Sequence, residues 1–349
     1  MYEYAFVIGR FQMFHRGHEW LLNEARKLGK ELVILVGSAN SPRSIKNPFT
    51  ISERVEVLNA FEGPKIIECL LDYPNDDNLW VSQVKNIISV VTNGASCCIV
   101  GCNKDDSTYY LNIFGDVPVV SLPHLDEFKN KKIDATNFRA ALFNYGIHDK
   151  MIDSSFALFG TSQKNLNDIL KRQVQEVFPL LQEEYNNIKK YKKMWDRSPF
   201  PPVFVTADNI VKHRDRFLAI VRKDHPSRGL LAMPGGFIES NETIRTSALR
   251  ELREETSIEI FNPKTGVKIP VQEEWFRASH VFDSPSRSLR GRTITHAFSW
   301  HIPDKYDVKI AAADDAADVV WLPLTELQNP MNATKFMEDH FHIIKFMIG

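Results

Sequence analysis

The chain lacks the features that mark membrane and secreted proteins. None of its apolar runs approaches the roughly 20 residues that a membrane-spanning helix needs. Its first residues, MYEYAFVIGRFQ, contain no basic segment followed by an apolar core, so we expect no signal peptide. We therefore expect a cytoplasmic protein that does not attach to membranes.

An excess of charge of one sign is also missing. The 43 lysines and arginines nearly balance the 44 aspartates and glutamates, which leaves a net charge of -1. A dedicated nucleic-acid-binding protein usually carries a clear basic excess, so we expect no nucleic-acid partner. Anionic small molecules need only local arginines and lysines, and they remain candidate ligands.

Cysteine is scarce and forms no recognisable framework. The four cysteines, Cys69, Cys97, Cys98 and Cys102, lie in the first third of the chain without a paired Cys-x-x-Cys spacing. We expect buried free thiols in a reducing compartment.

The first half of the chain has the pattern of an α/β domain. Short apolar runs at residues 4–9, 31–39 and 95–101 suit strands that are buried on both faces of a parallel sheet. Between the first two runs, Leu21, Leu22 and Ala25 lie at helical spacing. This strand–helix–strand order predicts a doubly wound, Rossmann-like sheet, which binds ligands beyond the carboxyl ends of its strands.

The 349 residues are sufficient for two domains. A helical pattern covers residues 165–195, within which Pro179 is expected to start a second helix. The segment DRSPFPP at 196–202 contains three prolines that stop any helix. We place the linker there, between an N-terminal domain of residues 1–195 and a C-terminal α+β domain of residues 203–349.

The second domain carries a cluster of carboxylates. We expect a hairpin from residues 202–211 and 216–223, later strands at 293–302 and 317–324, and a helix at 242–256. On that helix Glu251, Glu254 and Glu255 lie at i, i+3 and i+4, on one face. Such carboxylates repel one another, and Mg²⁺, which prefers oxygen ligands, relieves the repulsion. The alternative is a solvated acidic face.

The wider spacing resembles the Nudix box. Gly236, five residues, Glu242, seven residues and then RELREE at 250–255 follow that family's pattern. The resemblance implies a hydrolase of nucleoside diphosphate derivatives in which Glu251, Glu254 and Glu255 hold Mg²⁺ or Mn²⁺ and activate water, with Glu251 and Glu254 as catalytic residues. It also implies that Arg250 orients a glutamate and that Glu242 supports the loop. Ser257 replaces the family's final glycine, where a left-handed conformation costs serine about 1 kcal/mol.

A basic segment follows the helix. Arg287, Arg290 and Arg292 suit contacts with a diphosphate, although an exposed basic hairpin tip is the alternative. This segment and the string DDAADVVWLPLTEL at 314–327 are similar to the ADP-ribose pyrophosphatase branch of the Nudix family. In that reading, Asp314 or Asp315 supplies a further ligand or base.

The string GRFQMFHRGH at residues 9–18 is the most distinctive feature of the first domain. A zinc site would need further ligands near His15 and His18, and none is close in sequence. The histidines could also belong to the core. Gly17 favours a close approach of backbone to ligand, and Arg10 and Arg16 add positive charge. A cradle for phosphates therefore fits best.

The string is similar to the signature of nucleotidyltransferases, and specifically of archaeal-type nicotinamide mononucleotide (NMN) adenylyltransferases. Residues 37–54, 75–84 and 100–111 also resemble segments of that family, and IDATNFR at 133–139 resembles its last signature. Two residues depart from the pattern. Met13 replaces proline, which we expect to loosen the loop, and Asp134 replaces serine, which adds negative charge near the phosphates.

The resemblance implies that the phosphate of NMN attacks the α-phosphate of ATP, giving NAD and pyrophosphate. His15 and His18 would donate hydrogen bonds to the phosphates, Mg²⁺ would bridge them, and Arg10, Lys46 and Arg139 would neutralise them. Trp80 would stack on the nicotinamide ring, unless it is an ordinary buried tryptophan. The remaining substrate-binding residues that it implies are Gly9, Phe11, Gln12, Phe14, Gly17, Gly101, Asn103 and Thr136.

Together the two resemblances cover most of the chain and match the order of the bifunctional NMN adenylyltransferase/Nudix hydrolases. They imply that the first domain makes NAD and that the second hydrolyses ADP-ribose to AMP and ribose 5-phosphate. In one alternative, the Nudix domain only senses a nucleotide or acts on another nucleoside diphosphate derivative. A second alternative, a transcriptional regulator, would need a basic helix-turn-helix that the sequence does not contain. A homo-oligomer remains open.

Overall fold

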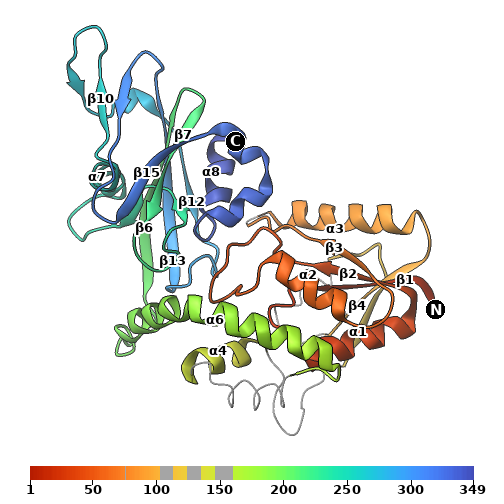
Figure 1. The fold of residues 1–349 in the computed structure, drawn as a ribbon. Coiled ribbons are helices and arrows are strands. Elements are labelled where there is room, and N and C mark those ends of the chain that lie inside the picture. Colours follow the sequence, from red (N-terminus) through yellow and green to blue (C-terminus); the bar gives the residue numbers. More distant parts are fainter. Residues whose placement is uncertain (75, 103–112, 124–134, 146–159) are drawn as a thin grey trace. The chain divides into compact units, whose positions relative to one another are not determined.

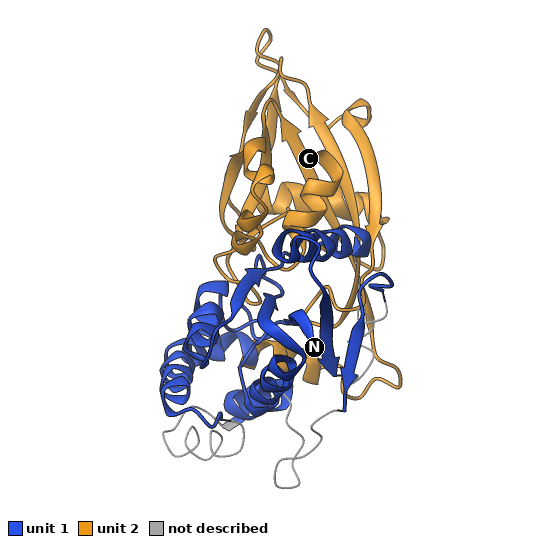
Figure 2. Cartoon of the chain, turned by 90° about the vertical axis from the view of Figure 1, so that its right-hand side faces the viewer, with its two compact units in different colours: residues 1–185 blue, residues 186–349 orange. Residues whose placement is uncertain are grey.

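A computed structural model describes residues 1–74, 76–102, 113–123, 135–145 and 160–349. The chain divides into two compact units, Met1–Tyr185 and Asn186–Gly349 (Figure 2). This division lies inside a helix and precedes residues 196–202, where the prolines indicate a linker. The expected domain boundary after residue 195 stays a prediction. In the described part of the chain, no helix has the length and apolar character to cross a membrane.

The first unit is built on a parallel sheet of five strands in the order β3-β2-β1-β4-β5 (Figure 1). Alternate residues of the central strand enter different apolar clusters. Ala5 and Val7 pack with Leu22 of the first helix, whereas Phe6 and Ile8 pack with Val84 of the third. Burial on both faces confirms the predicted doubly wound fold. Its elements are β1 (Tyr2–Gly9), α1 (Arg16–Leu28), β2 (Gly29–Val36), α2 (Ile51–Ala60), β3 (Ile66–Cys69), α3 (Asp77–Thr92), β4 (Cys97–Cys102), β5 (Val119–Leu122) and α4 (Ala135–Tyr145).

The strand order creates a topological switch point between β1 and β4. The chain leaves β1 toward β2 on one side, while β4 pairs with the other side of β1. Ligands of doubly wound sheets bind in the crevice at this point, beyond the carboxyl ends of the strands. The segment GRFQMFHRGH begins at Gly9, the last residue of β1, and therefore starts at that position.

Helix α6 (Lys164–Lys193) runs without a break through Pro179. The expectation that Pro179 starts a second helix is therefore wrong. Proline removes one backbone hydrogen bond, but apolar residues on both sides of it are buried in the core of the first unit, which offsets the loss. These residues are Val174, Val177, Phe178 and Leu181.

The second unit has a mixed sheet, as expected for an α+β domain. Its main path is β12-β13-β6-β7-β15, in which β13 and β6 are parallel and the other neighbours antiparallel. The expected hairpin and helix are both present. The elements are β6 (Val203–His213), β7 (Arg216–Arg222), β8 (Leu231–Ala232), β9 (Gly235–Phe237), α7 (Ile244–Thr256), β10 (Glu259–Phe261), β11 (Lys268–Ile269), β12 (Phe276–Phe282), β13 (Arg292–Ile302), β14 (Asp307–Lys309), β15 (Ala316–Pro323) and α8 (His340–Ile348).

The four cysteines are free thiols, as expected, but they differ in burial. Cys98 is buried, and burial raises the pKa of its thiol to about 11. Cys69 is exposed, so the expectation that all four are buried is wrong.

Candidate active sites

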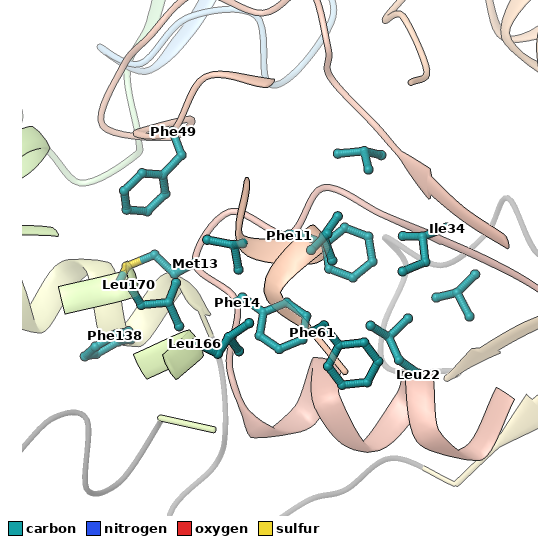
Figure 3. Packing of buried hydrophobic residues seen from close by; sticks show 14 of the residues in the cluster. Phe11, Met13, Phe14, Leu22, Ile34, Phe49, Phe61, Phe138, Leu166 and Leu170 are labelled. Atoms are coloured by element: carbon teal, nitrogen blue, oxygen red, sulfur yellow. The ribbon is translucent and has the colours of Figure 1, made fainter. Parts of the chain in front are cut away.

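The loop after β1 is held in an unusual conformation by its own apolar side chains. Phe11 and Met13 both have positive φ angles, of 51° and 64°. Both side chains are almost fully buried, and they pack with Phe14 among Phe49, Phe61, Phe138 and Leu170 (Figure 3). Proline cannot adopt a φ near 64°. Met13 therefore does not loosen the loop, as the sequence suggests, but anchors it in the core.

The two histidines of the loop lie together at the start of α1. His15 is the residue before the helix, and its Nδ1 accepts hydrogen bonds from the backbone N–H groups of Gly17, at 3.1 Å, and His18, at 3.4 Å. In the neutral ring, acceptance at Nδ1 assigns the proton to Nε2, which is thereby a donor. The His18 ring stacks on that of His15, with 3.9 Å between centroids, and contacts the Phe11 and Phe14 rings.

Arg54 joins this loop to the loop after β2. Its guanidinium donates to the carbonyls of Arg10, Gly37 and Ser38 at 2.6 to 2.9 Å, and it is almost completely buried. Burial lowers its pKa to about 10, so the group remains charged at neutral pH. Sequence reasoning included Arg54 in a family-like segment but missed it as a site residue. Its positive charge is therefore in contact with the loops that follow β1 and β2, which are neighbouring strands.

Gln12 makes a second connection between loops. Its amide donates to the Phe49 carbonyl at 2.9 Å and accepts from the Phe49 N–H at 3.0 Å. The backbone carbonyl of Gln12 accepts a hydrogen bond from Arg139 at 2.7 Å, and Arg139 also donates to the Thr136 hydroxyl at 3.2 Å. The structure thus brings Arg139 and Thr136 of α4 to the same loop as the histidines.

The other predicted residues of the first unit occupy varied positions. Arg10 and Lys46 are exposed, and Gly101 lies in the last part of β4, on the other side of the switch point. Trp80 is half-buried against Phe114, 5.9 Å between rings. Asn103 and Asp134 lie outside the described residues. The first unit therefore groups two histidines and several cations at the end of its central strands.

In the second unit, Arg250 organises the glutamates of α7. It donates to Glu242 at 2.7 and 3.1 Å, and to Glu251 and Glu254 at 2.8 Å each. Its hydrogen bonds hold the pKa of Glu242 at about 2. Glu242 also accepts from the backbone N–H of Glu239 at 2.9 Å, so it closes the loop before the helix. Arg250 therefore contacts all three of these carboxylates, whereas the Nudix resemblance implies only that it orients one glutamate.

A buried acidic cluster lies beside this network. The Glu255 carboxylate is 3% exposed and accepts from the Gly235 N–H at 2.8 Å. Burial raises the pKa of Glu255 to about 8, and it also raises the pKa values of Glu251 and of buried Asp208. A Cβ atom on Gly236 would lie 2.5 Å from Glu251 Oε1, so only glycine leaves room for that carboxylate. Sequence reasoning missed Asp208, which lies opposite Gly235 in β6.

This cluster has the chemistry of a divalent-cation site. Three desolvated carboxylates with raised pKa values disfavour being charged together, and a hard cation with oxygen ligands removes that penalty. The described residues contain no three His, Cys, Asp or Glu side chains already arranged around a single ion position. Glu254, which is paired with Arg250, would have to turn toward the cluster to join Glu251 and Glu255.

Ser257 ends α7 in the left-handed conformation, with φ 42° and ψ 36°. Its N–H donates to the Arg253 carbonyl at 2.9 Å and so caps the helix. The substitution for glycine therefore keeps the expected backbone path at a small conformational cost.

The three arginines of the basic segment differ in their contacts. Arg287 is buried and donates to both carboxylate oxygens of Asp339, at 2.8 and 3.0 Å. Arg292 donates to the Asp283 carbonyl. Arg290 lies over the Phe237 ring, 4.9 Å from its centroid. Asp314 and Asp315, both exposed, follow Ala313, whose N–H donates to the Glu255 carbonyl at 3.2 Å.

Comparison with known proteins finds relatives of both units. Residues 203–345 match the family model of the NUDIX domain, and residues 6–77 match the cytidylyltransferase-like model. A nicotinamide/nicotinic acid mononucleotide adenylyltransferase of Acinetobacter baylyi is 34% identical over 192 residues, 53% of this chain and 94% of that protein. An ADP-ribose pyrophosphatase of Methanocaldococcus jannaschii is 33% identical over 141 residues, 40% of this chain and 70% of that protein.

Solved structures of a bifunctional enzyme match the chain from end to end. A bifunctional NMN adenylyltransferase/ADP ribose pyrophosphatase from Francisella tularensis, complexed with AMP and a manganese ion, aligns with a TM-score of 0.86 and 32% identity. The alignment covers 100% of this chain and 99% of that one. The chain belongs to this bifunctional family. Its two units are accordingly an adenylyltransferase unit and a Nudix unit, and the sites at β1 and α7 are their candidate active sites.

Proposed function

We propose that the adenylyltransferase unit makes NAD from ATP and NMN and that the Nudix unit hydrolyses ADP-ribose with Mg²⁺ or Mn²⁺. One observation carries the proposal. A histidine pair at a sheet switch point and an arginine-linked set of glutamates occur in one chain that matches a bifunctional structure over its whole length. The two reactions are chemically related, because ADP-ribose is a breakdown product of NAD.

In the first reaction, a phosphate oxygen of NMN forms a bond to the α-phosphorus of ATP. The bond from that phosphorus to the bridging oxygen breaks, and pyrophosphate leaves. The protein has to align two anions and stabilise the charge on the transferring group. His15, with Nδ1 occupied by backbone donors, presents Nε2–H as a donor, and His18 stacks beside it. Arg54 holds the loop that carries them.

The test of this reaction is NAD formation by the purified full chain with ATP, NMN and Mg²⁺. His18→Ala should lower turnover by about a hundredfold or more, the usual effect of removing one donor to a transition state. His280→Ala is the matched control, because His280 is an exposed histidine of the Nudix unit. Absence of NAD with the wild-type protein, or equal rates in both variants, would reject the assignment.

In the second reaction, water attacks one phosphorus of ADP-ribose and the bridging P–O bond breaks. AMP and ribose 5-phosphate are the products. A divalent ion, when bound, lowers the pKa of water and offsets the charge of the diphosphate. Glu251, Glu254 and Glu255 would hold it. Arg250 positions Glu251 and Glu254 from one guanidinium nitrogen, and Glu242 fixes that arginine in turn.

The test is AMP release from ADP-ribose by the wild-type protein and by Glu254→Gln. Glu254 is 45% exposed, so its replacement should leave the fold intact while hydrolysis falls by about a hundredfold or more. Glu274→Gln, at an exposed glutamate outside the cluster, is the control. Equal hydrolysis by wild type and Glu254→Gln would contradict the metal role. No release by either would favour a unit that only senses the nucleotide.

A further inference from the structure

The side chain of Asn209 connects β6 to α7, to β13 and to the segment before β9. Asn209 lies in β6 and is completely buried. Its Nδ2 group donates to the backbone carbonyl of Ala248 in α7 at 2.7 Å, and to that of Pro234 at 3.3 Å. Its Oδ1 atom accepts from the indole N–H of Trp300 in β13 at 3.1 Å. The amide therefore uses both its donor and its acceptor inside the protein.

This asparagine stands in apolar surroundings. Ala207 and Val211, two positions before and after it, point to the same face of β6 and belong to the apolar cluster that includes Ala248 and Leu252 of α7. A buried amide in such a cluster is tolerated only when its hydrogen bonds are made, and an aliphatic side chain would suit these neighbours better. The bonds that Asn209 makes are therefore the feature that distinguishes this position.

On one side the amide holds the helix that carries the glutamates. Ala248 precedes Glu251 by three positions and Glu255 by seven, so the three residues lie along one face of α7. The bond from Asn209 to the Ala248 carbonyl therefore fixes α7 on the face that presents these carboxylates.

On the other side the amide holds the backbone that the carboxylates contact. The carbonyl of Pro234 also accepts from the backbone N–H of the asparagine, at 2.8 Å. Gly235 and Gly236 follow directly. The Gly235 N–H donates to Glu255 at 2.8 Å, and a Cβ atom on Gly236 would lie 2.5 Å from Glu251 Oε1. A small change in the separation of this segment and α7 would therefore disturb both carboxylates.

We infer that Asn209 is a positioning residue of the Nudix reaction. Its amide bonds the helix that carries Glu251 and Glu255 to the segment whose glycines contact them. It thereby keeps the two carboxylates where they would hold the divalent ion. Asn209 acts through these backbones and not by contact with the nucleotide. The inference rests on the proposed metal-dependent hydrolysis at this site.

The expected effect concerns the metal more than the nucleotide. Residues that support metal ligands contribute about ten- to a hundredfold to metal affinity or activity in other proteins. Asn209→Ala should therefore raise the Mg²⁺ concentration for half-maximal hydrolysis about tenfold or more and lower kcat by a similar factor. The KM for ADP-ribose at saturating Mg²⁺ should stay within about threefold of wild type.

The experiment measures ADP-ribose hydrolysis over a series of Mg²⁺ concentrations with full-length wild type, Asn209→Ala, Trp300→Phe and Val211→Ala. Urea denaturation gives the stability of each. Val211→Ala is the matched control, because it truncates a buried apolar side chain on the same face of the same strand. It should lose stability and keep the wild-type Mg²⁺ requirement. Trp300→Phe keeps a ring in the core but removes the donor to Asn209 Oδ1, and it should raise the Mg²⁺ requirement more than Val211→Ala does.

Loss of stability in Asn209→Ala without a change in the Mg²⁺ requirement would overturn the inference and leave the proposed function intact. If Asn209→Ala does not fold, Trp300→Phe takes its place in every comparison. Absence of hydrolysis by wild type would reject the proposed function instead. Calorimetric titration with Mg²⁺ in the absence of nucleotide then decides on Asn209. Affinity about tenfold weaker in Asn209→Ala than in Val211→Ala supports the positioning role, and equal affinities or no binding refute it.

Discussion

The buried carboxylate of Glu255 makes the stability of the Nudix unit depend on pH when no divalent ion is present. Its pKa in the folded state is about 8, above the ordinary value of 4.5, chiefly because burial penalises the charged form. The folded protein therefore binds this proton more tightly than the unfolded chain does. The stability that this bound proton gives to the folded state is fully present below about pH 4.5 and is lost as the pH rises to about 8.

The size of the effect follows from the shift. A difference of about 3.5 pKa units corresponds to about 5 kcal/mol, which is large compared with the total stability of a typical domain. Glu255→Gln removes the charge and keeps an oxygen that can accept from the Gly235 N–H. We expect this variant to resemble wild type at about pH 5 and to be more stable by several kcal/mol at about pH 9.

The assay is urea denaturation of the full chain in a chelator across this pH range, repeated with Mg²⁺. Added Mg²⁺ should restore most of the lost stability of wild type at high pH and have little effect on Glu255→Gln. The exposed variant Glu274→Gln should follow the wild-type curve. Parallel pH curves for wild type and Glu255→Gln, or equal stabilisation of both by Mg²⁺, would refute the reasoning.

Three further changes test local features of the two sites. His15→Asn should keep the helix cap, because asparagine caps helices well, and its unfolding free energy in urea should stay within about 0.5 kcal/mol of wild type. It should lose NAD formation, because asparagine lacks the Nε2–H donor. Retained activity would contradict the donor role. Met13→Pro should lower the free energy of unfolding by about 3 kcal/mol or more, since proline cannot adopt the φ of 64°. Met13→Leu should lower it by less than about 1.5 kcal/mol. Equal urea midpoints for the two variants would show that the loop is not constrained. Ser257→Gly should raise the thermal midpoint, by the equivalent of about 1 kcal/mol, with ADP-ribose hydrolysis unchanged; a lower midpoint would argue against strain at this cap.

Local patterns in the sequence predicted those features that depend on nearby residues. Strands β1, β2 and β4 can be recognised in the sequence as short apolar runs, because a strand buried on both faces has few positions for polar residues. The glutamates of α7 share a face because helical spacing requires it. The left-handed cap at Ser257 was expected from the Nudix resemblance, because the family's final glycine stands at that position.

Contacts that the sequence does not reveal depend on partners far along the chain. The guanidinium of Arg287, for which a substrate contact stays a prediction, is bonded to both oxygens of Asp339, 52 positions later. Arg54 owes its place to three carbonyls on two other loops, and Asp208 meets the acidic cluster only because β6 pairs with β9. None of these pairings leaves a local pattern. Pro179 was misread because buried residues on either side of it keep α6 continuous.

The central claim is that one chain carries two separate nucleotide reactions, and it is tested most directly by crossing two variants with two assays. The full-length proteins His18→Ala and Glu254→Gln would each be assayed for NAD formation from ATP and NMN and for AMP release from ADP-ribose, both with Mg²⁺. We predict that His18→Ala loses only NAD formation and that Glu254→Gln loses only ADP-ribose hydrolysis. Loss of both activities in either variant that remains folded, or loss of neither, would contradict the assignment of the two sites.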